Sequence, residues 1–104
     1  MSIFKTVQAN QNVSTVLFEN QGGSNLLNMN IETVTITNVD SNSVQVDLHV
    51  HEANGNGGIN HSVLKADIPA GVTLVYDTPF SFAHNQKLRI KPENRTCDLN
   101  IIIN

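Results

Sequence analysis

The chain is poor in the residues that support several common functions. Its 104 residues include no Trp, one Tyr and one Cys, and only 14% are charged. Because Cys97 has no partner for an intrachain disulfide, the fold does not depend on an oxidising compartment. Six Lys and Arg against nine Asp and Glu give a formal net charge of −3. The chain therefore has too few basic residues for the positive surface that nucleic acid binding requires.

Membrane insertion and secretion are also not indicated. No apolar run approaches the ~20 residues that cross a bilayer, so we expect no membrane partner. The first residues, Met1 to Lys5, lack the basic and then apolar pattern of a signal peptide. We therefore expect synthesis in the cytoplasm.

The sequence is rich in short segments that alternate apolar and polar residues, separated by turns of Gly, Pro, Asn and Ser. No window has the apolar period of a helix, and residues 25–30 form one helical turn at most. The pattern predicts an all-β, single-domain antiparallel β-sandwich over residues 1–104 with about eight strands. We expect it to be jelly-roll-like, but an immunoglobulin-like sandwich stays open because alternation does not give the strand order. The expected strands are residues 3–8, 13–18, 31–38, 43–51, 61–67, 72–77, 86–91 and 97–103.

The clearest element is a hairpin formed by residues 43–51 and 61–67. The apolar residues of both segments must share the core face, which predicts the register between them. That register makes four pairs: Leu64 with Leu48, Ala66 with Val46, Lys65 with Asp47, and His61 with His51.

The last strand predicts a core face and a polar face. Cys97 belongs to the alternating run that faces the core, so it is expected to be a buried small hydrophobe and not a nucleophile. Ile102 falls on the otherwise polar face, which indicates that this face is covered. Three carboxylates, those of Asp47, Asp67 and Asp98, are expected on exposed faces. Phe80 and Phe82 are expected to cap one end of the core.

The histidines are the weak candidates for a metal site. His49 and His51 project from one face of a strand, and the predicted register brings His61 opposite His51. Three imidazoles with Glu52 or His84 as a fourth ligand would suit zinc or another transition metal. The alternative, which we favour, is a solvated or interface face, because His-x-His on an exposed strand is a weak signal. We therefore predict no bound metal.

No catalytic arrangement emerges from the sequence. His49-x-His51 and Pro69-Ala70-Gly71 partly match the two motifs of small cupins, but Leu74 stands where the second motif has its His. Glycine-rich residues 54–58 lack the Lys of a phosphate-binding loop. We expect no enzyme, no catalytic residue and no cofactor.

From Ile31 onward the chain resembles small β-sandwich virion proteins of tailed bacteriophages. The stretches that carry the resemblance are residues 34–38, 44–50, 68–75, 80–82, 88–91 and 100–104. The resemblance implies a non-enzymatic capsid decoration or neck or tail accessory subunit, made in the host cytoplasm and located in the virion. It also implies a homo-oligomer, with a trimer as the expected state, and other virion proteins as partners.

A decoration subunit uses its outward strand faces as interfaces. Neutral polar side chains suit this role because they can hydrogen-bond across an interface without desolvating a charge. The predicted interface residues are Thr33, Thr35, Thr37, Gln45, His49, His51, His61 and Ile102. Residues 1–30 match the resemblance least and are expected to hold a docking arm as well as the first strands. Two alternatives stay open: a carbohydrate- or surface-binding module, and a small cupin-like metal-binding protein.

Overall fold

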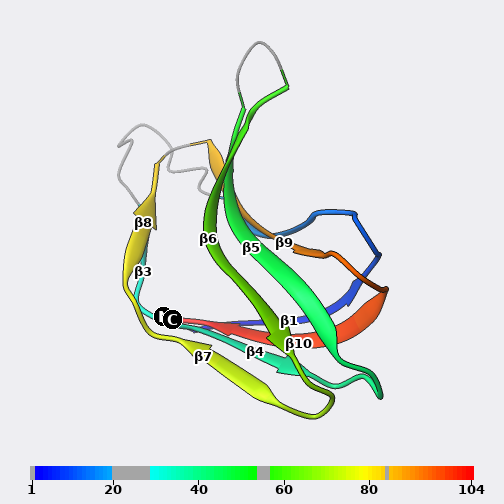
Figure 1. Ribbon diagram of the computed structural model, residues 1–104. Helices are drawn as coiled ribbons and strands as arrows, with labels where there is room; N and C mark the ends of the chain where they lie inside the picture. The colour runs from blue at the N-terminus through cyan, green and yellow to red at the C-terminus, as the bar shows by residue number, and fades with distance from the viewer. Residues whose placement is uncertain (1, 20–28, 54–56, 84) are drawn as a thin grey trace.

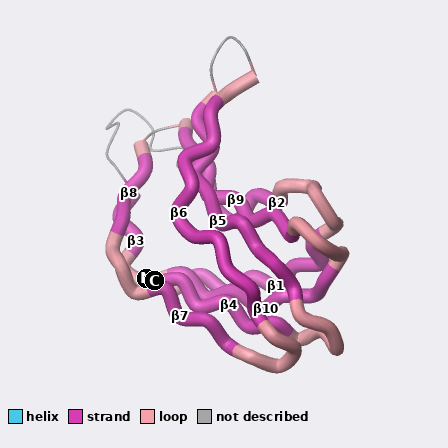
Figure 2. Tube along the Cα trace, in the orientation of Figure 1, coloured by secondary structure: helices cyan, strands magenta, loops and turns pink. Residues whose placement is uncertain are grey.

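The computed structural model describes residues 2–19, 29–53, 57–83 and 85–104, and its regular structure there consists of strands without helices. The all-β prediction is therefore confirmed. Figure 2 shows strands joined by loops throughout the described chain. The strands are β1 (Ile3–Ala9), β2 (Thr15–Glu19), β3 (Met29–Ile31), β4 (Val34–Asn38), β5 (Val44–Glu52), β6 (Ile59–Ile68), β7 (Thr73–Tyr76), β8 (Phe80–Phe82), β9 (Gln86–Pro92) and β10 (Cys97–Ile103).

Eight of these strands form two four-stranded antiparallel sheets. One has the order β1-β10-β4-β7 and the other β2-β9-β5-β6. Strands that follow one another in the chain mostly lie in different sheets, so the chain crosses repeatedly between the two layers. With β3 and β8 set aside, the orders become 1-8-3-6 and 2-7-4-5, which is the connectivity of a jelly roll. The sandwich prediction holds, and its jelly-roll form follows from the strand order.

The apolar residues of the two sheets face each other and make a single core. β3 and β8 pair as a third, two-stranded sheet beside the sandwich (Figure 1). Burial of the core side chains supplies the main favourable free energy of folding. The buried apolar residues are Val7, Ala9, Leu17, Ile31, Val34, Ile36, Val44, Val46, Leu48, Val50, Ile68, Phe82, Leu88, Ile90, Cys97, Leu99, Ile101 and Ile103.

The strand prediction was incomplete around the third sheet. The segment 31–38 splits into β3 and β4, and β8 was not predicted as a strand, although Phe82 is buried at the core as expected. Both strands contain three residues, too few for alternation to be recognised. Of the expected helical turn, residues 29–30 belong to β3 and residues 25–28 lie outside the described residues.

The hairpin register is confirmed for three pairs and wrong for the fourth. Leu64 pairs with Leu48, Ala66 with Val46 and Lys65 with Asp47, whereas His51 pairs with Asn60. The ladder shifts between Leu48 and His49, so β6 contains one extra residue at this point. Beyond such a β-bulge every pair of the ladder is shifted by one residue. His61 therefore lies opposite Val50 and not opposite His51.

A buried amide joins two turns at one end of the sandwich. The side chain of Asn38 is fully buried. Its Nδ2 donates to the carbonyl oxygens of Asn42 and Ile68, at 2.8 and 2.9 Å, and its Oδ1 accepts from the backbone N–H of Asp40. These bonds satisfy polar groups that would otherwise be costly to bury.

The N-terminal segment belongs to the sandwich where it is described. β1 pairs along its whole length with β10, and β2 pairs with β9. The remainder of the expected arm, residues 20–28, lies outside the described residues. The described residues contain no helix that is long and apolar enough to cross a membrane.

Candidate functional site

The outer face of the β1-β10-β4-β7 sheet carries two rows of side chains without charge. The strand register aligns the first row across all four strands, and the second row lies beside it. We call these eight residues the uncharged face. They are Phe4, Ile102, Thr35 and Val75 in the first row and Thr6, Asn100, Thr37 and Thr73 in the second.

Large apolar groups at this face are open to solvent. Phe4 is 71% exposed and Val75 is 58% exposed, at opposite edges of the same row. A hollow of about 290 Å³ between β1 and β10 contacts Phe4, Thr6 and Ile102, and Lys5 of β1 also lines it. In the second row, the hydroxyl groups of Thr37 and Thr73 are hydrogen-bonded at 2.8 Å. The face thus combines exposed apolar area with neutral hydrogen-bonding groups.

Three predicted interface residues, Thr35, Thr37 and Ile102, belong to the uncharged face, and all three are half-buried. Thr33 lies just before β4 and its Oγ1 accepts a hydrogen bond from Asn104 Nδ2 at 3.2 Å. Gln45 is exposed on the other sheet. The predicted interface residues therefore divide between the two sheets.

A polar cluster lies on the outer face of the second sheet. Alternation along β5 sends Asp47 and His49 away from the core, yet they are only 9% and 1% exposed. The expectation of an exposed Asp47 was therefore wrong, while Asp67 and Asp98 are exposed as expected. His49 is buried too deeply to contact a partner in this conformation.

Arg89 covers His49 by reaching across β5. Its Nε–H donates to His49 Nε2 at 3.2 Å, and its terminal NH2 group donates to Asn60 Oδ1 at 3.2 Å. Since Arg89 belongs to β9 and Asn60 to β6, the guanidinium group spans three adjacent strands of the sheet. The sequence pattern gave no signal of this bridge, because alternation alone does not show that β9 lies beside β5.

The bond from Arg89 determines the form of the His49 ring. A guanidinium N–H can only donate, so His49 Nε2 must be an unprotonated acceptor and the neutral ring carries its proton on Nδ1. Desolvation by burial lowers the pKa of His49, and the positive charges of Arg89 and Lys91 act in the same direction against the opposing effect of Asp47. His49 is therefore neutral near pH 7.

Ser14, His49 and Asp47 are the three residue types of a hydrolytic triad, with His49 between the other two, but they lack the triad's hydrogen bonds. Ser14 Oγ lies 3.5 Å from His49 Nε2, and His49 Nδ1 lies 3.7 Å from Asp47 Oδ1. Among the described residues, neither His49 Nδ1 nor Asp47 Oδ1 has a hydrogen-bond partner. The lone pair that would accept a proton from the serine already accepts the Arg89 N–H. In this arrangement His49 is not free to act as a general base.

The three candidate metal ligands do not converge. His51 Nδ1–H donates to Asn60 Oδ1 at 2.7 Å, whereas His61 Nε2 lies 3.0 Å from Glu52 Oε2. The bulge separates them, because it places His61 on the face of Val50, opposite to that of His51. The described residues contain no group of three His, Cys, Asp or Glu side chains that could hold a metal ion. The fourth-ligand candidate His84 lies outside the described residues.

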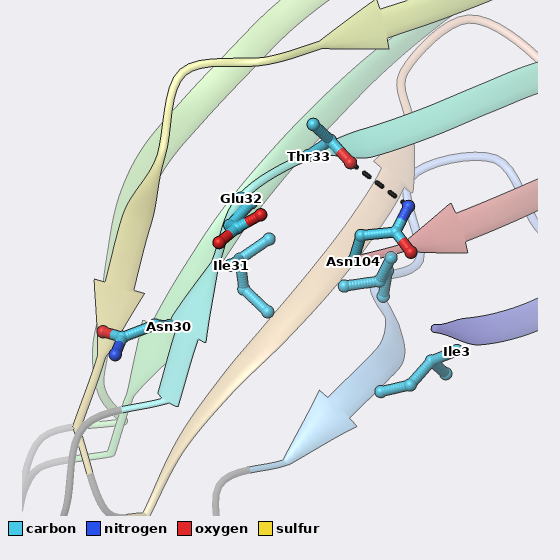
Figure 3. Close-up of a pocket in the computed structure, with 7 residues that line it drawn as sticks. Ile3, Asn30, Ile31, Glu32, Thr33 and Asn104 are labelled. Atoms are coloured by element: carbon cyan, nitrogen blue, oxygen red, sulfur yellow. Dashed lines mark hydrogen bonds between the residues drawn. The ribbon is translucent and has the colours of Figure 1, made fainter. Parts of the chain in front are cut away.

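Two hollows flank the connection between β3 and β4. The one in Figure 3 has a volume of about 480 Å³, with Ile3 and Ile31 at its apolar wall and Glu32 at its rim. Figure 3 also shows the hydrogen bond between Thr33 and Asn104 at the end of this hollow. The second hollow, of about 630 Å³, also contacts Glu32 and extends to Asp77 and Phe80.

Comparison with known proteins supports the fold and goes no further. No family model and no curated protein matches the chain. A solved structure described as the crystal structure of PirA is similar, with a TM-score of 0.54 and 13% sequence identity. The match covers 98% of this chain and 90% of the PirA chain. At this identity the similarity concerns the β-sandwich architecture alone.

Proposed function

We propose that this chain is a non-catalytic structural subunit of a tailed-phage virion, either a capsid decoration protein or a neck or tail accessory protein. The observation that carries the assembly role is the uncharged face, on which Phe4 and Val75 are exposed at the two edges of one sheet. The virion context comes from the sequence resemblance. The proposed location is the virion, and the proposed partners are other virion proteins and further copies of this chain.

The composition of the uncharged face suits association with another protein. Exposed apolar area gains free energy when a partner removes it from water. The Thr and Asn side chains of the second row can form hydrogen bonds across an interface without desolvating a charge. Copies of a chain with net charge −3 repel one another least where they meet through uncharged groups.

The size of the face favours an assembly with many contacts. The face is four strands wide, at about 4.8 Å a strand, and about four residues long, at about 3.4 Å a residue. It therefore covers about 300 Å². A stable binary complex buries roughly 800 Å² on each partner. An interface smaller than this binds weakly alone but becomes effective when one subunit makes several such contacts at once, since linked binding events raise the overall affinity. A repeated particle lattice provides that situation.

The jelly-roll fold is compatible with this role and with both alternatives. Jelly rolls occur in viral capsid proteins, lectin domains and cupins, so the choice depends on surface features. A cupin-like metal site is not supported by the geometry of His49, which is buried under Arg89 on the outer face of a sheet. A sugar-binding platform would need several exposed aromatic rings close together. Phe4 is the exposed ring among the described residues, and Tyr76 is half-buried against Phe80.

Quantitative mass spectrometry of purified phage particles tests the virion role. The expected result is a fixed, stoichiometric copy number in each particle, and absence from the particles would contradict the proposal. Light scattering tests the oligomer, for which a trimer is expected and a strict monomer would count against self-association.

Substitution of the uncharged face tests the docking surface. The double variant Phe4→Ser and Val75→Ser should fold normally, because both side chains are largely exposed, and should lower incorporation into particles by about tenfold or more. The matched control is Val16→Ser, an exposed valine on the opposite sheet that is 45% exposed. Equal incorporation of the double variant and the control would show that docking uses another surface.

A further inference from the structure

His49 Nε2 has two polar neighbours that differ in their chemistry. Arg89 Nε lies 3.2 Å away and Ser14 Oγ 3.5 Å away. The arginine nitrogen can only donate a hydrogen bond, whereas the serine hydroxyl can donate or accept. One ring nitrogen therefore faces one partner that requires it to be unprotonated and one partner that tolerates either state.

Protonation changes which of these neighbours His49 can bind. In the neutral ring Nε2 accepts the Arg89 N–H. When Nε2 gains a proton it becomes a donor, and two N–H groups then point at each other between two positive charges. We propose that acid exchanges the partner of His49, so that the imidazolium donates to Ser14 and releases Arg89.

The charges around His49 determine the balance between the two states. Asp47, on the same strand, is the carboxylate that faces the ring and favours its protonation. Arg89 and Lys91 on β9 oppose it. The register places Lys65 of β6 directly opposite Asp47, so this carboxylate also faces a cation from the other side.

The remaining neighbours of the ring on this face carry no acidic group. Ser62 of β6 lies opposite His49, and Val16 of β2 lies opposite Arg89. His51, two residues along β5, is joined to Asn60 by a hydrogen bond at 2.7 Å. Asp47 is therefore the single acidic group of the described residues that acts on His49 at short range.

The exchange would alter the surface of the β2-β9-β5-β6 sheet. In the neutral state Arg89 lies across β5 and ends at Asn60, where His51 also donates. Without its bond to His49, the guanidinium group keeps only Asn60 as a partner from these strands and can turn toward solvent. Acid then presents a cation on this face. The switch does not depend on the proposed virion role or on the uncharged face.

Long-range ¹H–¹⁵N NMR of the labelled protein, followed from pH 8 to pH 5, tests the exchange directly. At pH 8 the His49 ring should carry its proton on Nδ1, and on acidification the Arg89 Nε–H resonance should move with the same midpoint as the ring. A ring protonated on Nε2 at pH 8, or an Arg89 resonance that does not follow His49, would overturn the proposal.

Two variants separate the roles of the partners. Arg89→Gln should raise the midpoint of His49 by about one pH unit, because it removes a nearby cation. Lys87→Gln is the matched control, since Lys87 is two residues from Arg89 on the same face of β9. Its Nζ lies 4.0 Å from Glu19 Oε1, so its polar contact is with Glu19 and not with His49. This control should leave the midpoint unchanged. Equal shifts in the two variants would show that Arg89 acts on His49 through its charge and not through the hydrogen bond, which would overturn the proposal.

Ser14→Ala tests the acid state alone. Loss of the serine hydroxyl removes the acceptor for the imidazolium, so the midpoint of His49 should fall while the ring keeps its proton on Nδ1 at pH 8. Ser14 precedes β2 and is half-buried, so this variant also serves if Arg89→Gln does not fold. An unchanged midpoint in Ser14→Ala would overturn the exchange.

Discussion

The neutral, buried imidazole of His49 couples the stability of the fold to pH. Burial lowers the pKa of His49 below its ordinary value of about 6.5, so the unfolded chain binds a proton more readily than the folded chain. The stabilising contribution is therefore complete above pH 6.5 and is lost as the pH falls toward the pKa of the folded state. Each unit between the two pKa values corresponds to about 1.4 kcal/mol.

We predict that His49→Gln will remove this part of the pH dependence. The amide oxygen of glutamine can still accept a hydrogen bond from Arg89, but the side chain does not titrate. In urea unfolding, the wild type should exceed the variant in free energy of unfolding by more at pH 7.5 than at pH 5.5. Other titrating groups contribute equally to both proteins, so a difference that is the same at both pH values would contradict the prediction.

At the scale of single residues, little of the polar cluster could be predicted from the sequence. The His-x-His spacing drew attention to His49, but its burial depends on Arg89 reaching over it. That contact requires β9 to lie beside β5, and alternation predicts the facing of a strand without its neighbours. The relation of Asp47 to Lys65 was predictable because the two belong to one hairpin.

At the scale of elements, alternation located strands well and failed at bulges. The predicted segment 97–103 agrees with β10, and the other main strands differ from prediction by a few residues at their ends. The register of β6 was lost where Val63 and Leu64 stand together, both packed on the core. β2 has a similar irregularity at Leu17, within three consecutive apolar residues. Adjacent apolar residues accompany both irregularities but do not identify them, because Ile101, Ile102 and Ile103 of β10 also follow one another in a regular ladder.

A pair of aspartate substitutions tests the bulge in β6. Because Val63 packs on the core, Val63→Asp should lower the free energy of unfolding by about 2 kcal/mol or more. Ser62 is exposed, so Ser62→Asp should change it by less than about 0.5 kcal/mol. Regular alternation from Leu64 would reverse the two results, since it turns Val63 outward and Ser62 inward. Chemical denaturation of both variants decides between the two arrangements.

At the scale of the whole molecule, the two sheets share one core, and Cys97 reports on its integrity. Cys97 is 1% exposed and pairs with Ala9 across β1 and β10. β10 lies between β1 and β4, so its side chains are protected by strands on both sides as well as by the facing sheet. Burial raises the pKa of the Cys97 thiol to about 11, which suppresses the reactive thiolate in the folded state.

We predict that alkylation of Cys97 requires global unfolding. For a domain with a stability of about 5 kcal/mol, iodoacetamide at pH 8 should modify the folded protein at least about a thousandfold more slowly than the urea-unfolded chain. Across a urea series, the extent of modification should follow the loss of the circular dichroism signal of the strands. β1 is an edge strand of its sheet, and its separation from β10 alone would expose the thiol earlier. Modification at urea concentrations where the strand signal is still native would therefore identify β1 as a separately opening unit and contradict a single cooperative core.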